Sequence, residues 1–593
     1  MRRLLSLALA AAVAAAALSS CTSSNESGAA TAAGATSSPA AANTKATGST
    51  PTASTTSDGS THDDPADYTW DESTVVAIEL KGTTATSARS SVKVSGSTVT
   101  ITEAGSYRLS GTLSDGQVVV DTDDKDTVRL ILNGVTITNG DQAALTVTDA
   151  KKVVVILADG SKNTLTDGAK YTFADSSTDE PNAALYSTAD LTIAGNGSLT
   201  VTGKYNDGIT GKDGLVIAGG TIVVEAADDA VRGKDYLVVK GGSLTVKAGG
   251  DGLKADNAED TALGFVTILD GTLAIKAAGD GIQAESTVTV AGGKLAITTG
   301  GGAAAKVAAD ASAKAIKGAA SVAIKGGTFT IDSADDALHS NVAVTIDGGN
   351  LTIATGDDAI HGDKSVTVNG GTVNITKSYE GLESIALVIN GGEITVVASD
   401  DGLNAADGTG GGVPGARPGG AVAGNNTLTI NGGTILVSAN GDGIDINGSV
   451  TMTGGTLIVQ GPTANNNGAL DYDGTFNMTG GFIVAAGSAG MAQSPGASST
   501  IKSIALRFSA VQPAGAIVHI QTAGGEEIVT FKSEKSFQSL VVSSPKLQSG
   551  VTYDVYTGGT ATGTNQMGFY PAGAYSGGTK STTTTVSTGA TGR

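Results

Sequence analysis

Residues 326–347 read GGTFTIDSADDALHSNVAVTID, and this stretch decides the fold of the chain. After the glycine pair, and again near the end of the stretch, β-branched or aromatic residues alternate with small polar residues. Alternation with a period of two predicts strands that bury one face and expose the other. Each alternating run is too short for a helix, so the stretch predicts three short strands joined by three corners.

The whole pattern then repeats along the chain with a step of 22 residues, as from Gly326 to Gly348 and Gly370. A fixed period of this size is typical of a solenoid, whose stacked units bury one continuous core. Each strand then lies beside the same strand one coil later, so the strands run parallel at a spacing of about 4.8 Å. The sequence therefore predicts an all-β parallel β-helix with about 22 residues per coil. A nonapeptide calcium roll has a period less than half as long and is excluded.

The glycine pair marks one corner of each coil, because glycine adopts positive φ without steric cost. It recurs at 219/220, 241/242, 292/293, 326/327, 348/349, 370/371, 391/392, 432/433 and 454/455. Longer spacings predict loops inserted between coils, near 256–264, 308–319 and 407–426. The last of these is rich in glycine and contains Pro414 and Pro418. It is expected to be mobile.

The N-terminus reads as a processing signal. Arg2 and Arg3 precede an apolar run that ends in Leu18-Ser-Ser-Cys21, which has the form of a bacterial lipobox. Cys21 is the single cysteine, and its lipidation would hold the protein on the extracellular face of the cell membrane. An ordinary secretion signal is the alternative.

Composition divides the rest of the chain. We expect a lipoprotein signal at 1–21, a disordered Ser/Thr/Ala-rich tether at 22–67, and an N-terminal cap with the first strands at 75–117. The parallel β-helix is expected at 118–490, and a tail like the tether is expected at 571–593. From residue 501 the 22-residue period is lost while alternation continues, which predicts a small antiparallel β cap at 497–570.

The formal net charge is −21, and it becomes −23 when Arg2 and Arg3 are removed with the signal. Nucleic acids and anionic membrane surfaces are therefore excluded as partners, and the lipid anchor remains the expected membrane contact. Metal ions are the simplest cationic partner. Aromatic residues make up only 4 % of the chain, and the single tryptophan, Trp70, lies beside the tether. This argues against a flat aromatic platform for crystalline cellulose.

An acidic motif, such as Asp-Asp-Ala-Leu at 335–338 or Gly-Asp-Gly-Ile at 441–444, recurs after the glycine-rich corners. Its aliphatic residue points inward, so the next residue points outward. Along the rod this outward row reads Thr210, Arg232, Lys254, Gln283, His339, His361, Glu383, Asn404, Asp445 and Asp471. Asp445 and Asp471, with Asn447 and Asp473 two residues further on, form an expected oxygen cluster. This cluster is the best single calcium site predicted from the residues. The alternative is a solvated edge that carries no ion.

Four outward residues are candidates for ligand contact. Arg232 and Lys254 could hold a sugar carboxylate, or could neutralise the neighbouring aspartates. His339 and His361 are expected to stack on adjacent coils, where two imidazoles could bind a transition metal. They could also be plain surface residues.

Three stretches carry a resemblance to a known family: residues 101–116 (ITEAGSYRLSGTLSDG), 130–137 (LILNGVTI) and 163–168 (NTLTDG). They resemble the opening of a secreted bacterial carbohydrate-binding β-helix family, which is related in fold to the pectate lyases. The resemblance covers roughly residues 75–570. It implies a right-handed parallel β-helix, calcium ions at its turns, and binding to cellulose and to acidic pectin chains.

The same resemblance implies that the aspartate directly before the Gly or Ala of each motif lies beside calcium. These residues are Asp207, Asp229, Asp251, Asp280, Asp336, Asp358, Asp401 and Asp442. One coil departs from the pattern with Gly302, where an ion row would break, and another has Glu380. Two carboxylates ~4.8 Å apart repel by about 0.9 kcal/mol in water, which favours a bound cation. The alternative is that Asp-Gly serves as turn chemistry alone.

Three functions remain open from the sequence. Motifs that recur on nearly every coil suit a repeating polymer better than a single scissile bond. A non-catalytic, cell-surface polysaccharide-binding protein, aided by Ca²⁺ and expected to be a monomer, is therefore the favoured hypothesis. A calcium-dependent, pectate-lyase-like enzyme is the first alternative, with Arg232 or Lys254 as the base. A structural surface spike or adhesin is the second.

Overall fold

The computed structural model describes residues 61–173, 175, 177–308, 311–406 and 425–586, which all fall in one compact unit. The predicted signal, Cys21 and most of the predicted tether and of the loop at 407–426 lie outside the described residues. Within them, no helix has the length and apolar composition needed to span a membrane.

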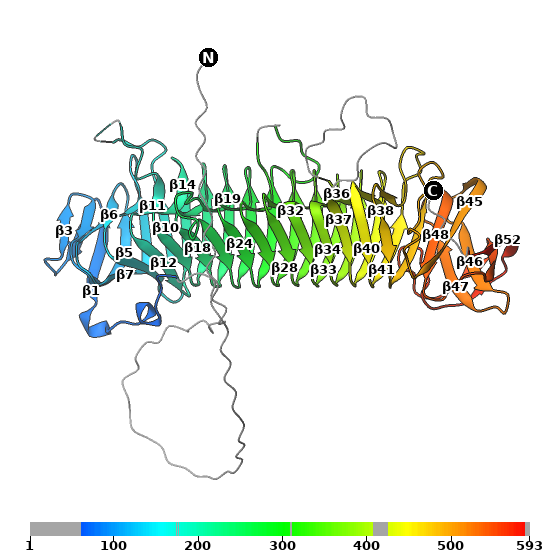
Figure 1. Ribbon diagram of the computed structural model, residues 1–593. Coiled ribbons are helices and arrows are strands. Elements are labelled where there is room, and N and C mark those ends of the chain that lie inside the picture. Colours follow the sequence, from blue (N-terminus) through cyan, green and yellow to red (C-terminus); the bar gives the residue numbers. More distant parts are fainter. Residues whose placement is uncertain (1–60, 174, 176, 309–310, 407–424, 587–593) are drawn as a thin grey trace, which may run out of the picture. The chain divides into compact units, whose positions relative to one another are not determined.

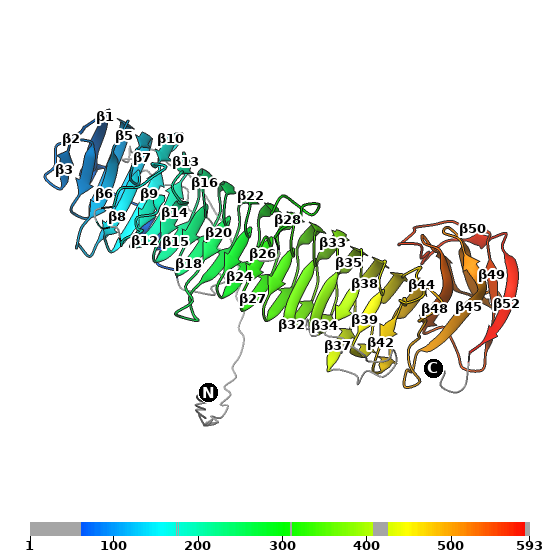
Figure 2. The same ribbon diagram turned by 90° about the horizontal axis from the view of Figure 1, so that it is seen from above.

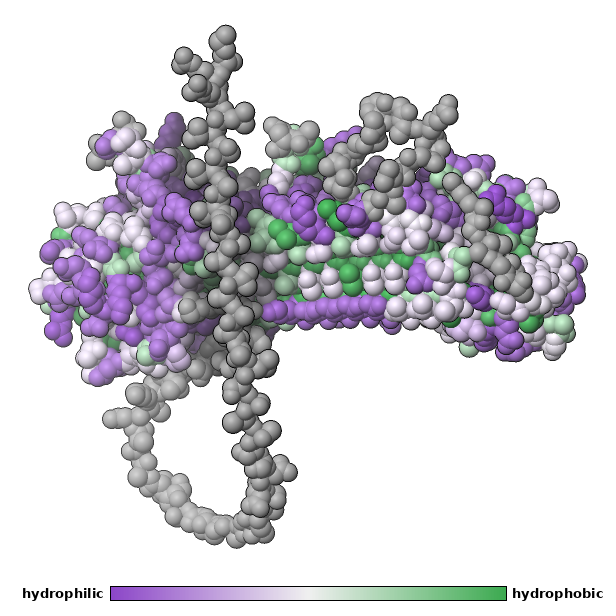
Figure 3. Space-filling model, viewed as in Figure 1, coloured by the Kyte–Doolittle hydropathy of each residue, from purple (hydrophilic) through white to green (hydrophobic). Residues whose placement is uncertain are grey.

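The described chain forms a parallel β-helix, which confirms the predicted fold class (Figure 1). Phe329 pairs in register with Leu351, and Leu351 pairs with Val373, so each residue lies beside its equivalent one coil later. The step between these partners is the 22-residue period of the sequence. The repeated positions form bands along the coils, alternately hydrophilic and hydrophobic (Figure 3).

Each coil contributes one strand to each of three faces. The motif face begins each coil and contains β4 (Thr98–Ile101), β6 (Gln117–Asp121), β8 (Leu145–Asp149), β11 (Ala183–Ser187), β14 (Asp207–Gly211), β17 (Val231–Gly233), β20 (Leu253–Ala255), β23 (Ile282–Ala284), β26 (Ile316–Gly318), β29 (Leu338–Ser340), the first halves of β32 (Ile360–Val368) and β34 (Leu382–Ile389), β36 (Leu403–Ala405), β39 (Ile444–Ile446) and β42 (Asp471–Tyr472).

The second face contains β9 (Lys152–Leu157), β12 (Asp190–Gly195), β15 (Gly214–Ile217), β18 (Tyr236–Val239), β21 (Phe265–Ile268), β24 (Thr287–Val290), β27 (Ser321–Ile324), β30 (Ala343–Ile346), the second halves of β32 and β34, β37 (Asn426–Ile430), β40 (Gly448–Met452) and β43 (Phe476–Met478). The third face contains β10 (Lys162–Thr166), β13 (Ser198–Gly203), β16 (Thr221–Ala226), β19 (Ser243–Ala248), β22 (Thr272–Ala277), β25 (Lys294–Thr299), β28 (Thr328–Ser333), β31 (Asn350–Thr355), β33 (Thr372–Ser378), β35 (Glu393–Ala398), β38 (Thr434–Ala439), β41 (Thr456–Gln460) and β44 (Phe482–Gly487).

Alternation builds the core as the sequence predicted. In β28, Phe329, Ile331 and Ser333 are buried, and the residue before each of them is exposed. The second glycine of each corner pair has φ between 83° and 103°. A Cβ at Gly371 would also lie 2.7 Å from the carbonyl oxygen of Gly349 on the preceding coil. Both the backbone conformation and the close stacking of corners therefore require glycine there.

Antiparallel strands close both ends of the stack (Figure 2). At the N-terminal end, β1 (Val76–Gly82) pairs with β2 (Ala85–Ser87) and β3 (Val92–Ser95) pairs with β4, beside the long strands β5 (Gly105–Leu113) and β7 (Thr127–Thr138). At the other end, β48 (Phe537–Ser544) pairs antiparallel with both β44 and β45 (Lys502–Gln512). The caps cover core and strand edges that an open solenoid would expose.

The segment 61–67, which composition assigned to the disordered tether, is ordered and lies against the second face. His62 contacts the Tyr236 hydroxyl through Nδ1 at 2.7 Å and Thr192 Oγ1 through Nε2 at 2.8 Å. Asp63 pairs with Lys240 at 2.6 Å, and Asp67 pairs with Lys152 at 2.7 Å. Two short 3₁₀ helices follow, η1 (Pro65–Tyr68) and η2 (Glu72–Thr74). These polar contacts order a segment that lacks large apolar residues.

The predicted disordered tail also contains ordered strands. The cap includes a four-stranded antiparallel sheet of β46 (Ile517–Thr522), β47 (Glu527–Lys532), β49 (Thr552–Thr557) and β52 (Thr579–Thr585), and a small pair of β50 (Thr560–Ala561) and β51 (Tyr575–Ser576). β52 pairs along the whole of β49. Threonine favours extended backbone, and the ladder supplies the stabilisation that composition alone did not indicate. Ordered structure therefore continues to residue 586.

Candidate functional site

The motif face carries the outward row that the alternation predicted. The strand register places its members side by side on successive coils, in the order Thr210, Arg232, Lys254, Gln283, Lys317, His339, His361, Glu383, Asn404, Asp445 and Asp471. Lys317 is the member that sequence reasoning missed. Basic side chains lie in the first half of the row, two histidines in the middle and acids in the second half.

The aspartate of each motif stabilises the next coil through its backbone. Asp229 Oδ1 accepts a hydrogen bond from the N–H of Asp251 at 2.8 Å, and Asp251 Oδ1 accepts one from Asp280 at 2.8 Å. The same contact is made by Asp207, Asp336, Asp358 and Asp401. One carboxylate oxygen of these motif residues therefore satisfies a backbone donor at the corner. The second oxygen, Oδ2, is left to face the outward row.

In the first half of the row, basic side chains neutralise these second oxygens. Lys254 Nζ lies 3.0 Å from Asp229 Oδ2 and 2.9 Å from Asp251 Oδ2. Arg232 lies 3.6 Å from Asp207 and 2.5 Å from Asp256. The buried carboxylates raise the pKa of Lys254 and of Arg232. Of the two roles that the sequence left open for these cations, the structure supplies the contacts for the neutralising one.

In the coil after Asp280, the motif position was expected at Gly302. The structure has Lys314 at this position instead. Its N–H donates to Asp280 Oδ1 at 2.8 Å, the position that an aspartate fills in other coils. Its ammonium contacts Asp335 Oδ1 at 2.8 Å and Asp336 Oδ2 at 2.6 Å. The inserted segment after β25 displaced the spacing, so the sequence comparison selected Gly302 in place of Lys314. The row of carboxylates is interrupted here by a lysine.

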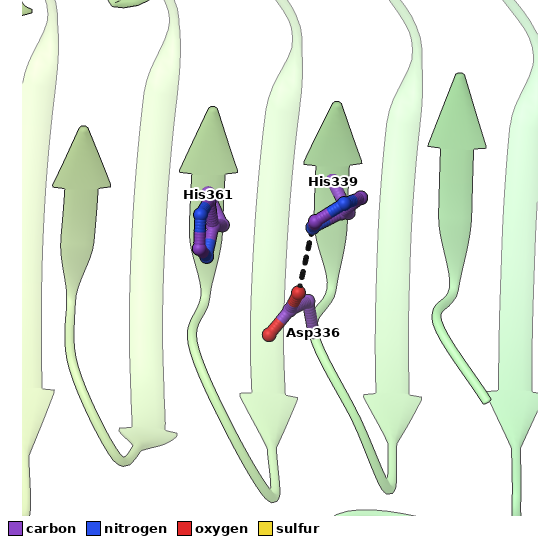
Figure 4. A group of neighbouring side chains, drawn as sticks. All are labelled: Asp336, His339 and His361. Atoms are coloured by element: carbon purple, nitrogen blue, oxygen red, sulfur yellow. Dashed lines mark hydrogen bonds and ion pairs between the residues drawn. The ribbon is translucent and has the colours of Figure 1, made fainter. Parts of the chain in front are cut away.

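The two histidines are neighbours, as predicted, with ring centroids 5.1 Å apart. His339 Nδ1 lies 2.9 Å from Asp336 Oδ2 (Figure 4). His361 Nδ1 lies 3.3 Å from Asp358 Oδ2 and 3.2 Å from Glu383 Oε2. Burial alone would raise the pKa of Asp336, but the hydrogen bond with His339 and the charge of Lys314 lower it to about 2. Three successive coils thus bring two imidazoles and three carboxylates together.

Toward the C-terminal end of the row, the carboxylates of Asp401, Asp442 and Asp445 form no ion pair with a lysine or arginine among the described residues. Ligand oxygens of Asp401, Asp442 and Asp445 all lie within 4.8 Å of one another. Burial and mutual repulsion raise the pKa of Asp401 to about 6, of Asp442 to about 8 and of Asp445 to about 7. We call these three residues the acidic cluster. Its oxygen ligands fit a hard divalent cation such as Ca²⁺.

Of the four residues of the predicted oxygen cluster, Asp445 belongs to the acidic cluster. Asp471 pairs with Asp445 in register, while Asn447 and Asp473 are exposed. Ligand oxygens of two motif residues, Asp401 and Asp442, lie within 4.8 Å of that of Asp445. Sequence reasoning treated the motif row and the outward row as separate sets. The structure shows that side chains from both rows meet.

Sequence reasoning also missed a group of aromatic rings beside the first motif aspartates. Tyr171 stacks on Tyr205 with centroids 4.4 Å apart, and Phe173 lies 6.0 Å from Tyr171. The Tyr171 hydroxyl donates to Asp167 Oδ2 at 2.9 Å. All three rings are half-buried. Because Tyr171 and Phe173 lie between coils, outside the repeat, no periodic signal indicated this group.

Parts of the chain are similar to known proteins. Residues 95–359 match the carbohydrate-binding domain-containing protein family. A carbohydrate-binding domain-containing protein of Acetivibrio thermocellus is 45 % identical over 135 residues, which cover 23 % of this chain and 47 % of that protein. The chain thus spans about half the length of this relative. A solved polysaccharide lyase-like protein from C. thermocellum, a gadolinium derivative, is 37 % identical, with a TM-score of 0.38 over 38 % of this chain and 92 % of that one.

The fold and the row together define a repetitive β-solenoid that presents one outward side chain per coil in a single row. Residues 95–359, less than half of the chain, match the model of the carbohydrate-binding domain-containing protein family. The predicted resemblance is supported for this part of the chain.

Proposed function

We propose that the protein binds an acidic polysaccharide of the polygalacturonate type, with Ca²⁺ between the acidic cluster and the uronate carboxylates. The observation that carries this proposal is the outward row on the motif face. The row continues from coil to coil, both within residues 95–359, which match the carbohydrate-binding domain-containing protein family, and beyond them. A periodic row of side chains suits a polymer whose sugars are also periodic. Repetition offers many equivalent contacts and no unique catalytic group.

A cation between protein and polymer follows from the charge. The chain has a formal net charge of −21, so an anionic glycan is repelled unless its carboxylates and those of the protein share a positive ion. Ca²⁺ takes 6–8 oxygen ligands and accepts them from two molecules at once. The acidic cluster supplies three carboxylates on two coils, and uronate oxygens would complete the shell. Arg232 and Lys254, each about one quarter exposed, would contact the chain at the other end of the row.

Sedimentation with insoluble polygalacturonate tests the proposal. We expect the protein to pellet with the glycan in Ca²⁺ and to remain in solution in EDTA. The double variant Asp442→Asn, Asp445→Asn should lose at least tenfold in affinity, since it removes two ligands of the ion. Asp123→Asn, an exposed aspartate outside the row, is the matched control and should bind as the wild type does.

Two other results would point to other functions. Binding to neutral cellulose that ignores calcium would contradict the calcium-bridged mode and favour a hydrogen-bonding face of threonine and asparagine. Steady release of unsaturated oligomers that absorb in the ultraviolet, lost in Arg232→Ala or Lys254→Ala, would identify a lyase. A protein that sediments with no glycan at all would support a structural spike.

We further propose that Cys21 is lipidated and anchors the protein outside the cell membrane, because it ends an apolar run with the form of a lipobox. Cys21→Ser should move the protein from the membrane fraction to the soluble extracellular fraction, since the lipid anchor is its expected membrane contact. Fractionation of cells followed by immunoblotting measures this. A variant that stays bound to membranes as the wild type does would rule out the anchor.

A further inference from the structure

His339 and His361, with the carboxylates of Asp336, Asp358 and Glu383, form a histidine cluster in the middle of the row. Its chemistry differs from that of the rest of the row. On the coils of the first half of the row, the motif carboxylates face lysine or arginine, which cannot ligate a metal while charged. His339 and His361 occupy the same outward position with imidazoles, which bind transition metals in their neutral form. Two adjacent residues that can bind a metal therefore occupy the position that lysine and arginine occupy in the first half of the row.

The other two histidines of the chain show what a structural imidazole looks like here. His62 has both ring nitrogens bonded to hydroxyls, those of Tyr236 and Thr192. His519 has Nδ1 bonded to Thr530 at 2.8 Å and Nε2 to Gln521 at 3.0 Å. By contrast, His339 and His361 both turn Nδ1 toward motif carboxylates. His62 and His519 each have one carboxylate near Nδ1, Asp190 at 3.2 Å and Glu527 at 3.7 Å. Among the described histidines, only His339 and His361 belong to groups of three possible metal ligands.

The geometry brings the ligand atoms within reach of one ion. One ligand atom each of Asp336, His339 and His361 lie within 4.8 Å of one another, and the same holds for Asp358, His361 and Glu383. His361 belongs to both groups, so an ion beside it has ligands on either side. A zinc ion bonds such nitrogen and oxygen ligands at about 2.0–2.2 Å. Figure 4 shows His339 and His361 on neighbouring strands above Asp336.

The carboxylates are held in place by the backbone of the solenoid. Asp336 Oδ1 accepts the N–H of Asp358 at 3.1 Å, and Asp358 Oδ1 accepts the N–H of Glu380 at 3.2 Å. Their Oδ2 atoms are therefore fixed toward the imidazoles, as second contacts fix the ligands of metal sites. Both aspartates are buried, at 3 % and 6 % exposure, which limits competition by water.

The charge around His361 also favours a divalent ion. Lys314 already contacts Asp336, but among the described residues the only ion-pair partner of Asp358 and Glu383 is His361. A single imidazolium offsets one of these two carboxylates. A divalent cation offsets both and leaves the imidazole free to act as a ligand.

We propose that the protein binds one divalent transition-metal ion of the zinc class through one ring nitrogen each of His339 and His361 and a carboxylate oxygen of Asp336, with Asp358 and Glu383 on the other side of His361. Two nitrogen ligands and a carboxylate oxygen suit Zn²⁺, and Cu²⁺ or Co²⁺ as probes, far better than Ca²⁺, which prefers oxygen alone. This site is separate from the acidic cluster and does not depend on glycan binding. It would join three consecutive coils at the middle of the rod.

Calorimetry with Zn²⁺ on tag-free, EDTA-treated and dialysed protein tests the inference. We expect one ion per chain, unaffected by millimolar Ca²⁺. His361→Gln and the double variant His339→Gln, His361→Gln should weaken binding by about 10–100-fold or more. The variant Asp442→Asn, Asp445→Asn is the control and should bind Zn²⁺ as the wild type does. Unchanged binding in the histidine double variant would overturn the assignment.

A spectroscopic measurement keeps the test independent of how the variants fold. Cu²⁺ added at one equivalent to the wild-type protein should show nitrogen hyperfine coupling from two imidazoles in electron paramagnetic resonance. A spectrum with oxygen ligands alone, or no bound Cu²⁺ after dialysis, would overturn the proposal. Circular dichroism of each variant checks that the β-helix is retained.

Discussion

In EDTA, the melting temperature of the protein should fall as the pH rises from about 5 to about 9, and Ca²⁺ should remove most of this dependence. The reason lies in carboxylates whose pKa is raised in the fold: Glu380 and Asp442 to about 8, Asp445 to about 7 and Asp401 to about 6. A carboxyl with a raised pKa stabilises the fold fully below its unfolded pKa of about 4. That stabilisation is lost as the pH passes through the folded pKa.

Ca²⁺ reverses the effect at alkaline pH because it binds the deprotonated acidic cluster. An ion that binds only the folded state stabilises it by about 2.7 kcal/mol at 100 times its dissociation constant. Mg²⁺ should do less, since it demands a small octahedral shell and gives up water reluctantly. Differential scanning calorimetry at several pH values, with each ion, measures both effects.

Variants locate the effect within the rod. In EDTA at pH 8, Asp442→Asn with Asp445→Asn should melt higher than the wild type, because repulsion is removed, and should no longer respond to Ca²⁺. Asp123→Asn should behave as the wild type does. Since coils contact only their neighbours, hydrogen exchange in β39 and β42 should report the same change locally. A wild type that responds to neither pH nor calcium would mean that these aspartates serve the corners alone.

The repeat made most of the fold predictable from the sequence. A fixed period determines which residues become neighbours, so the pairing of His339 with His361 followed from counting alone. The pairing of Asp445 with Asp471 followed from the inward-pointing aliphatic residue that precedes each of them. The same logic failed where an insertion shifted the count, as at Lys314. It also gave no information on contacts between segments outside the repeat, such as His62 with Tyr236 or β52 with β49. Those contacts depend on three-dimensional proximity that has no period in the sequence.

The electrostatics of the row were predictable in kind but not in detail. Stacked carboxylates were expected to need cations, and the sequence suggested bound metal ions throughout. The structure divides the row instead. Lysine and arginine neutralise the carboxylates of the first half, while the acidic cluster has no such partner among the described residues. The distinction requires side-chain positions, because Lys254 contacts two aspartates on different coils.

Replacement of Lys254 by methionine should destabilise the rod by roughly 2–4 kcal/mol, near the cost of leaving buried carboxylates without their partner. The ammonium of Lys254 lies between Asp229 and Asp251, whose side chains are 7 % and 16 % exposed. Methionine keeps most of the side-chain volume, so the loss is mainly one of charge. Urea unfolding monitored by circular dichroism at pH 8 measures it.

Lys247→Met is the matched control for this prediction. Lys247 pairs with Glu225, but the two side chains are 66 % and 58 % exposed, and exposed pairs contribute about 0–1 kcal/mol. The same substitution, seven residues away and on the third face, should therefore change stability little. Lowering the pH to about 5 should partly restore the Lys254→Met variant, because the unpaired carboxyls can then take up protons. The triple variant Lys254→Met, Asp229→Asn, Asp251→Asn should recover part of the loss at pH 8. If Lys254→Met and Lys247→Met unfold alike, the buried pairs do not hold the first half of the row together.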